Sequence, residues 1–571
     1  MCGILIFQSN NLNKEIDRNF RLSLNDLKNR GPDELKIIKN KNLLLGFTRL
    51  SINNLKNGSQ PFTSLCGKYQ IVFNGEVVNY KNLIQDLKRK NIKIKYGTEA
   101  EVILNLFILY GDKCVNYLRG FFAFVIIEKK SNNIFAAVDR FSIKPLYYYQ
   151  DKKKQLTIIA SDFSTLIKNN IIKKELNLSK ILDYFSLARD FDNLTIFQNI
   201  KKLKASTILK IKNNKISTLQ YWHPFKNKIS VKSHIDANNL VNNKLFEITN
   251  LWKVAETKIS LCLSSGVDSQ LLNHFCYKNK INLTRFHIKE GKIKFSNFEE
   301  SIKINQDSKK IISLLNEFIN NSCNPFPLAH ASSTSLFQLY SEIKSKKFKF
   351  TLNGEGLDEL FGGYERYKKQ LYLNKCKKLS FSETILEVYK SEMANIKNNF
   401  KYNLIKNYKK ILMKKIDKVI LHSQKIENKM LEFDQICWIP VLVQRHDSIG
   451  MNYGLEVRPP FLDHEFVDLI NSLPTHMKYN ESNNKILLRE LLEKRLKYKI
   501  SKVKIGTPSV FRKIMNNNIE INNFKETVFY GACQKFLNTK KVIRKIKKNY
   551  VISDEIFLWR LYILNKIFYN F

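Results

Sequence analysis

A group of small and acidic residues at 264–269 has the composition of a phosphate-binding turn. The apolar run at 259–263 before it predicts a buried strand, and the run at 271–275 after it predicts the start of a helix. Such a turn lets the backbone approach a ligand closely, and the helix N-terminus offers unpaired N–H groups and a favourable dipole to an anion. A carboxylate within the turn would repel phosphate unless a divalent cation lay between them. Asp268 is therefore a candidate Mg²⁺ ligand.

The sequence of this turn, S-S-G-V-D-S, resembles the pyrophosphate-binding loop of the ATP pyrophosphatases, which cleave ATP to AMP and pyrophosphate. It does not fit the G-x-x-x-x-G-K-[ST] loop, because no lysine stands at the required place. The usual loop reads S-G-G, and this chain carries Ser265 in place of the first glycine.

The second chemical candidate is Cys2, which becomes the terminal residue once Met1 is removed. Its α-amino group, with a reference pKa of about 8, can then act as the base for the neighbouring thiol. A cysteine at this place can equally be a small buried thiol without a catalytic role. The residues that follow it decide between these interpretations.

Short polar motifs follow Cys2 in order, each at a turn or near the end of a predicted strand or helix. They read R-G-P-D at 30–33, R-L-S-I at 49–52, Q-P-F at 60–62, N-G-E at 74–76, T-E-A-E-V at 98–102, and D-R to K-P-L-Y at 139–147. In this order and spacing, the stretch from Cys2 to about Ser161 resembles the N-terminal-nucleophile glutaminase domain of class II glutamine amidotransferases.

This resemblance implies a site that hydrolyses a side-chain amide, which needs a nucleophile, a base and donors for the oxyanion. Cys2 would supply the thiol and, through its free amine, the base. The Asn74 side chain and the Gly75 N–H would form the oxyanion hole.

The same resemblance implies how glutamine is held. Arg49 would bind its carboxylate, and Glu76 with Glu99 would bind its amine. The family usually has aspartate where Glu99 stands, so this chain places a carboxylate one methylene further out. The other predicted glutamine-binding residues are Leu50, Ser51, Ile52 and Asn74.

The second half of the chain alternates predicted strands with predicted helices, which favours a doubly wound parallel sheet. Strands are expected at 283–288 and 350–352, and the latter runs into N-G-E-G-L-D-E-L-F-G-G-Y at 353–364. Two glycines around a carboxylate at the C-terminal end of a strand suit a ligand site in an open α/β sheet. Further motifs lie at 454–463, 485–489 and 502–508.

Joined to the glutaminase-like half, these motifs resemble glutamine-dependent asparagine synthetases of the bacterial type over roughly residues 1–515. The resemblance implies that Asp268 and Asp358 hold Mg²⁺ against the pyrophosphate of ATP. It also implies that Glu355 and Lys502 act at an adenylated carboxylate, where Lys502 stabilises charge as ammonia attacks. The predicted ATP-binding residues are Leu263, Ser264, Gly266, Asp268, Ser269, Ile288, Asn353 and Gly354.

The implied reaction has two steps in two places. ATP adenylates a carboxylate, glutamine is hydrolysed at Cys2, and ammonia crosses between the domains to displace AMP. Because free ammonia is mostly ammonium at neutral pH, a water-poor passage between the sites would help. Lys504 is the alternative to Lys502 in the second step, and the spacing to Pro508 favours Lys502.

Aspartate is the leading acceptor, and two alternatives stay open. The stretch at 290–306, E-G-K-I-K-F-S-N-F-E-E-S-I-K-I-N-Q, is short and basic in the region that shapes the acceptor pocket in family members. The same machinery could therefore amidate another carboxylate, such as a uronic acid in surface polysaccharide synthesis. An inactive or basic binding protein on this fold is the other alternative. The joint presence of Cys2, Asp268, Glu355 and Asp358 argues against it.

The predicted fold is an α+β N-terminal-nucleophile glutaminase sandwich (αββα) followed by an α/β parallel-sheet ATP pyrophosphatase domain with a largely helical C-terminal part. We expect the glutaminase domain at 2–210, a linker at 211–235, the synthetase domain at 236–515 and a basic C-terminal extension at 516–571. A chain of 571 residues is long enough for two to four domains of this kind.

Composition indicates a cytoplasmic protein. No apolar run approaches the ~18 residues of a membrane span, and the first ten residues lack the basic start of a secretory signal. The nine cysteines are dispersed, which is typical of a reducing compartment. The resemblance also implies a homodimer.

The formal net charge of +45 invites a nucleic-acid interpretation, which we do not favour. Lysine is spread along the whole chain together with abundant asparagine and isoleucine, as expected from AT-rich coding. The runs at 406–415 and 540–548 are predicted to be solvated helix faces, and no specific nucleic acid is expected.

Overall fold

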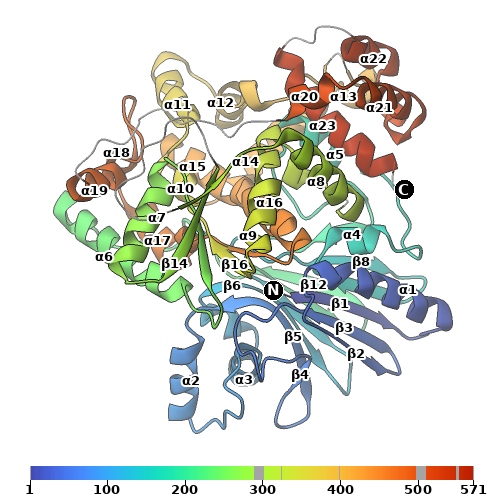
Figure 1. Cartoon of the computed structure of the whole chain (residues 1–571), viewed down its shortest axis with the longest axis vertical. Helices are drawn as coiled ribbons and strands as arrows, with labels where there is room; N and C mark the ends of the chain where they lie inside the picture. Colours follow the sequence, from blue (N-terminus) through green and yellow to red (C-terminus); the bar gives the residue numbers. More distant parts are fainter. Residues whose placement is uncertain are drawn as a thin grey trace.

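The computed structural model describes residues 2–288, 301–322, 324–397, 399–496, 510–547 and 552–569. Two antiparallel sheets of six strands each form the N-terminal half, and a parallel sheet of five strands lies in the C-terminal half. Figure 1 shows the antiparallel sheets in the lower part of the molecule and the helices around the parallel sheet above them. The predicted fold class is confirmed.

The first antiparallel sheet has the strand order β10-β8-β9-β1-β3-β2 and carries the N-terminus in its interior. Side chains of β1 alternate between its two faces, as a strand requires. Ile4 and Ile6 point into the space between the two sheets, whereas Leu5 and Phe7 pack under α1. The bounds are β1 Cys2–Ser9, α1 Lys14–Asp26, β2 Glu34–Asn40, β3 Leu43–Arg49, β8 Tyr147–Asp151, β9 Leu156–Ala160 and β10 Ile200–Lys202.

The second antiparallel sheet has the order β12-β11-β7-β6-β5-β4 and faces the first. Val72 and Val125 meet Ile4 and Ile6 in the buried layer between the sheets, and α2 and α3 cover the outer face. The bounds are β4 Phe62–Thr63, β5 Tyr69–Val77, α2 Tyr80–Arg89, α3 Glu99–Tyr110, β6 Gly120–Glu128, β7 Ile134–Val138, β11 Thr207–Lys212 and β12 Lys215–Gln220.

The boundary predicted at residue 210 falls inside β11. Strand β12 follows and pairs with β11 throughout, from Thr207↔Gln220 to Lys212↔Lys215, so this sheet continues to Gln220. Residues 221–233 then hold no helix or strand, and α6 (His234–Trp252) begins the second half. The linker predicted at 211–235 therefore starts too early, because residues 211–220 complete β11 and form β12.

The parallel sheet has the order β15-β14-β13-β16-β17, so the chain leaves β13 toward one edge and returns to build the other. This reversal between β13 and β16 is where ligands bind in open α/β sheets. The bounds are β13 Ile259–Cys262, α7 Val267–Lys278, β14 Leu283–Ile288, β15 Ser301–Ile304, α8 Ser308–Asn321, α9 Ser335–Ser345, β16 Phe350–Leu352, α10 Leu357–Phe361, α16 Ile439–Asn452, β17 Glu456–Arg458 and α17 His464–Ser472.

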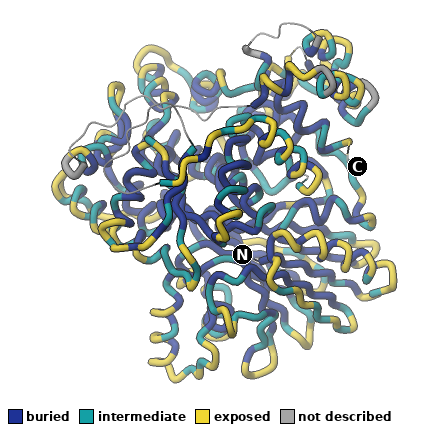
Figure 2. Tube along the Cα trace, viewed as in Figure 1, coloured by how far each residue is buried: buried dark blue, intermediate teal, exposed yellow. Residues whose placement is uncertain are grey.

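Helices make up most of the remaining chain. The last helix, α23, is part of the packed interior, and Figure 2 shows its buried trace. Trp559 Nε1 donates to the Leu328 carbonyl at 2.6 Å, and Arg560 Nη1 donates to the Phe185 carbonyl at 2.8 Å. The C-terminal segment thus joins both halves. The bounds are α11 Glu365–Cys376, α12 Phe381–Val388, α14 Tyr408–Val419, α15 Ile426–Cys437, α19 Ile486–Leu496, α21 Asn518–Tyr530, α22 Thr539–Lys547 and α23 Ile552–Tyr569.

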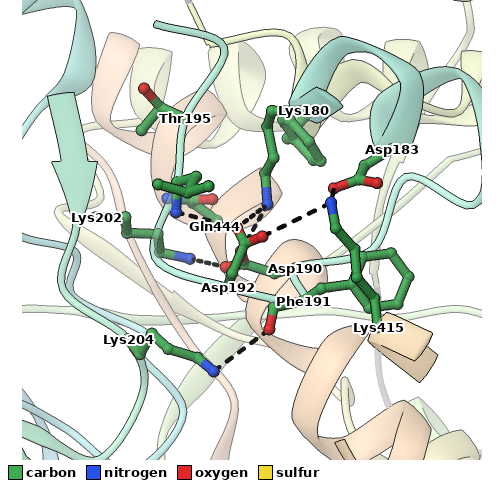
Figure 3. Close-up of polar contacts among 12 residues, drawn as sticks. Lys180, Asp183, Asp190, Phe191, Asp192, Thr195, Lys202, Lys204, Lys415 and Gln444 are labelled. Carbon is green, nitrogen blue, oxygen red and sulfur yellow. Dashed lines mark hydrogen bonds and ion pairs between the residues drawn. The ribbon is translucent and has the colours of Figure 1, made fainter. Parts of the chain in front are cut away.

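An ion-pair cluster on α5 (Leu178–Ser186) ties the glutaminase-like half to α14. Lys180 Nζ lies 3.0 Å from Asp192 Oδ1, and Lys415 Nζ of α14 lies 2.6 Å from Asp183 Oδ2, as Figure 3 shows. Lys180 is almost fully buried, and its neighbouring aspartates raise its pKa to about 12 against the opposing effect of burial. Lysines 409, 410 and 414 of the same run are exposed, as predicted, whereas Lys415 is partly buried.

Within the described ranges, none of the helices combines the length and apolar character that a membrane crossing requires.

Candidate active sites

A pocket opens at the start of β1, where Cys2 pairs with Arg49 of β3 across the sheet. Most of the predicted glutamine-site residues line it. Ser51 and Asn74 are not among the lining residues; the Ser51 N–H is bonded to Asp33 Oδ2 at 2.7 Å, and Asn74 is buried beside Cys2. The residues of this set that line the pocket are Cys2, Arg49, Leu50, Ile52, Gly75, Glu76 and Glu99.

Asn74 contacts the backbone of the predicted nucleophile Cys2 and has a buried N–H₂ group that could stabilise an oxyanion. The Cys2 backbone nitrogen, which becomes the α-amine when Met1 is removed, donates to Asn74 Oδ1 at 2.9 Å. The other end of the same amide, Nδ2, is buried and has no hydrogen-bond partner among the described residues. Buried donors are nearly always paired, so this one is explained best by a missing acceptor such as a developing oxyanion.

Gly75 follows Asn74 and has a φ of +138°, in the region that side chains rarely adopt. A Cβ on this residue would lie 2.1 Å from the Phe121 carbonyl oxygen of β6. No other residue fits here without moving one of the two strands. The glycine therefore lets the Asn74–Gly75 backbone pack closely against the β6 backbone at Phe121.

Burial raises the pKa of the Cys2 thiol, which by itself opposes nucleophilicity. The positive chain terminus, a hydrogen bond from the Leu50 backbone and the charge of Arg49 lower it in part. The thiol thus needs a base at short range, and the α-amine of the same residue is placed to be that base.

Two buried carboxylates face the pocket from neighbouring elements. Burial is the main cause that raises the pKa of Glu76, to about 7, and it raises the pKa of Glu99 well above its usual value. Glu99 also accepts the Val77 N–H at 2.7 Å. Glu101, the other carboxylate of the same motif, instead accepts N–H groups from residues 95, 96 and 97 and holds that turn. A cation in the pocket would therefore meet Glu76 and Glu99.

Residues from the second half of the chain contact side chains that line the pocket. Arg458 of β17 is fully buried and lies 3.5 Å from Glu76 Oε1, while its Nη1 donates to the Val254 carbonyl at 2.7 Å. The Asn53 amide donates to Glu76 and also reaches the Val254 carbonyl at 3.3 Å. The loop that carries Asn53 is thus held in one polar network with Arg458 of the parallel sheet.

The second site lies at the C-terminal ends of β13 and β16. The turn after β13 folds on itself, because Ser269 Oγ accepts the Ser264 N–H at 2.9 Å and Gln270 Nε2 donates to the Ser264 carbonyl at 2.7 Å. Ser265 is not in the left-handed region of φ, so the departure from glycine there causes no backbone strain. A Cβ on Gly354 would lie 3.0 Å from the backbone at Asp268, which shows how closely the two loops approach.

Asn353 stands at the centre of this approach. Its N–H donates to the Arg458 carbonyl at 3.0 Å, which continues the sheet by one residue. Both polar atoms of its side chain are buried and lack a partner among the described residues. A buried amide that pairs with none of the described residues is suited to hold a polar ligand.

Asp268 and Asp358 converge on one cation. Lys485 Nζ lies 2.6 Å from Asp268 Oδ1 and 2.7 Å from Asp358 Oδ1. Since both carboxylates reach one ammonium, they can also share one Mg²⁺, which takes one or two carboxylates together with phosphate and water oxygens. The carboxylate pair raises the pKa of Lys485 against the effect of burial. The sequence had marked Lys485 only as part of the 485–489 motif, without a role.

Glu355, two residues beyond Asn353, is the residue predicted to act at the carboxylate substrate. Its Oε1 lies 2.8 Å from His446 Nε2 and 3.2 Å from Arg445 Nη2. Ile288 is the last residue of β14, and the segment at 289–300 lies outside the described residues, as do Lys502 and Lys504. The structure therefore brings together all the predicted residues of this site except Ile288, which lies on the next strand, and Lys502.

These features define a class of protein: an N-terminal-nucleophile glutaminase fold joined to an ATP pyrophosphatase-type sheet. Residues 1–222 match the family described as glutamine amidotransferase domain, and residues 248–519 match the family described as asparagine synthase. These two matches, one in each half of the chain, support a glutamine-dependent protein of the asparagine synthase type, whose named relatives are ATP-dependent amide ligases.

The curated relatives include proteins named asparagine synthetase and proteins named amidase. Asparagine synthetase [glutamine-hydrolyzing] 3 of Bacillus subtilis is 25% identical over 513 residues, which cover 82% of this chain and 80% of the relative. Asparagine synthetase [glutamine-hydrolyzing] 1 of the same organism is 25% identical over 564 residues, with 91% and 88% covered. Amidase chry2 of Gibberella zeae is 23% identical over 588 residues and 86% of each chain is covered.

Proposed function

We propose that this protein adenylates aspartate with ATP and amidates it to asparagine, using ammonia released from glutamine. The observation that carries the proposal is the presence, in one chain, of two sites that each hold a buried asparagine amide nitrogen with no hydrogen-bond partner among the described residues. Asn74 stands beside a thiol nucleophile, and Asn353 stands beside a pair of carboxylates that share a cation.

In the glutaminase step, the Cys2 amine takes the thiol proton and the sulfur attacks the glutamine amide carbon. Asn74 Nδ2 and the Gly75 N–H would stabilise the oxyanion. The amine then returns the proton to the leaving nitrogen, so ammonia departs and a thioester remains for water to hydrolyse. Glu76 and Glu99 would pair with the glutamine ammonium.

In the synthetase step, Asp268 and Asp358 would hold Mg²⁺, which neutralises charge on the phosphates when bound. Asn353 would orient the nucleotide, and Lys485 would add a positive charge next to the pyrophosphate. An acceptor carboxylate oxygen bonds to the α-phosphorus and pyrophosphate leaves. Ammonia then attacks the acyl carbon, Glu355 takes a proton from the nitrogen, and AMP leaves with the electron pair of the broken C–O bond.

One observation favours a second class of carboxylate substrate in place of aspartate. Relatives of similar coverage include both asparagine synthetases and amidases such as chry2, so the family matches alone do not select aspartate. A uronic acid or another carboxylate would use the same Asn353, Asp268 and Glu355.

The test follows asparagine, AMP and pyrophosphate together, with glutamine, Mg-ATP and aspartate supplied. The proposal expects asparagine and AMP in a ratio of one to one. Cys2→Ala is expected to lose the glutamine-dependent reaction and keep the ammonia-dependent one. Pyrophosphate release that requires a carboxylate other than aspartate would refute aspartate as the acceptor and leave the ligase chemistry in place.

A further inference from the structure

A buried chain of side chains reaches Glu355 from two helices behind the synthetase site. Figure 1 shows α9 and α16 beside β16, whose end leads to Glu355. The Tyr340 hydroxyl of α9 is hydrogen-bonded to His446 Nδ1 of α16, and His446 Nε2 lies 2.8 Å from Glu355 Oε1. Tyr340 and His446 are both buried, with 1% and 5% of their surfaces exposed, so solvent does not compete for these contacts.

The protons in this chain can be assigned. Burial raises the pKa of Tyr340 well above its usual value, so the hydroxyl keeps its proton and donates it to His446 Nδ1. Burial lowers the pKa of His446, which keeps the ring neutral. A neutral ring that accepts at Nδ1 must carry its proton at Nε2. His446 therefore donates to Glu355.

The charged groups around the ring support this assignment. Arg445 Nη2 donates to the same Glu355 oxygen at 3.2 Å and lies 3.2 Å from His446 Nε2. The arginine contact does not decide the tautomer, whereas the carboxylate oxygen only accepts, so Nε2 at 2.8 Å from Glu355 Oε1 must carry the proton to bond to it. Among the described residues, Cys262 of β13 also lies close enough to Tyr340 to raise its pKa. Both donors hold Oε1 and fix the plane of the carboxylate.

We propose that Tyr340 and His446 are positioning residues that hold the Glu355 carboxylate for proton transfer from the attacking ammonia. This inference rests on the proposed function, in which Glu355 accepts that proton. The tyrosine fixes the tautomer of the histidine, and the histidine fixes the orientation of the carboxylate. Adenylation of the acceptor does not require this proton transfer, so the two half-reactions respond differently to loss of the pair.

The test compares Tyr340→Phe and His446→Gln with the wild-type enzyme in both half-reactions. Carboxylate-dependent exchange of pyrophosphate into ATP reports adenylation, and ammonia-dependent amide formation reports the second step. Tyr340→Phe is expected to lower the kcat of amide formation about tenfold, the effect of losing one hydrogen bond that orients a reacting group, with exchange within about twofold. His446→Gln is expected to lower it further.

A matched control is His223→Gln. His223 is also buried, accepts the Phe225 N–H at Nδ1 at 3.3 Å and lies 3.4 Å from Glu432 Oε1, away from Glu355. Its replacement is expected to leave the ratio of the two rates unchanged. Equal loss of exchange and amide formation in Tyr340→Phe would indicate a purely structural role and overturn the proposal, as would no loss in either.

The tautomer of His446 is a second readout, and it does not depend on which carboxylate the enzyme amidates. The chain has nine histidines, so ¹⁵N-histidine labelling with His446→Gln for assignment can identify the His446 ring signals. We expect the Nε2–H tautomer in the wild type and its loss in Tyr340→Phe. An Nδ1–H tautomer in the wild type would overturn the positioning role even if aspartate proves not to be the acceptor. If exchange requires another carboxylate, only the proposed acceptor fails, and the rates are measured with that carboxylate.

Discussion

Binding of glutamine to the inert variant Cys2→Ala is expected to depend on pH through Glu76. Its folded-state pKa of about 7, raised chiefly by burial, means that the side chain is mostly protonated at pH 6. The ammonium group of glutamine needs the ionised carboxylate, so binding below pH 7 must release a proton. One released proton per ligand makes the dissociation constant fall about tenfold per pH unit as pH rises toward 7. Above pH 7 the contribution of Glu76 to this dependence should level off.

Calorimetry between pH 5.5 and 8 measures this dependence directly. Titrations at pH 6 in two buffers with different ionisation enthalpies count the protons released, and about one is expected. Glu76→Gln is the control, because it removes the titrating group and should bind weakly at every pH. A dissociation constant that stays flat from pH 5.5 to 7, or no proton release at pH 6, would refute the assignment of Glu76 to the substrate ammonium.

Three further predictions concern single residues. Asn74→Ala should lower the kcat of glutamine hydrolysis by about 10²–10³, as for loss of one oxyanion donor, and leave ammonia-dependent synthesis unchanged; a rise in KM alone would contradict this. Lys485→Ala should weaken Mg-ATP binding and slow pyrophosphate exchange at least tenfold, because Asp268 and Asp358 lose their shared ammonium. Glutaminase activity should persist in this variant. Unchanged exchange would argue against a role of Lys485 at the phosphates. Lys180→Met should destabilise the fold by about 1.5–3 kcal/mol in urea unfolding, because it removes a buried ammonium from the half-buried Asp190 and Asp192, which among the described residues keep only Lys202 and Lys415 as ion-pair partners, and a loss below about 1 kcal/mol would show that the cluster is solvated.

Much of both sites could be predicted because their signals are local in the sequence. The turn at 264–269, the 353–358 motif and Cys2 each combine a strand end with small or polar residues, and their order identified the family. The alternation of strands and helices predicted a doubly wound parallel sheet, and the structure places the two motifs where this sheet reverses its strand order.

The contacts that complete the sites could not be predicted because they join distant parts of the chain. Lys485 meets Asp268 across 217 residues, and Tyr340 meets His446 across 106. In a chain with 96 lysines and arginines, no local signal separates Lys485 from its neighbours. Likewise, the domain boundary predicted at 210 falls short, because only the pairing of β12 with β11 shows that the antiparallel sheet continues to Gln220.

The central claim is that one chain couples a thiol glutaminase to an adenylating ligase. The most direct measurement supplies ¹⁵N-amide-labelled glutamine with Mg-ATP and aspartate, together with an excess of unlabelled ammonium in the buffer. The account expects ammonia to cross between the domains through a water-poor passage, so it predicts asparagine labelled in its amide nitrogen and formed one-to-one with AMP. Asparagine that carries mostly unlabelled nitrogen, or glutamate release without any amide product from aspartate, would contradict it.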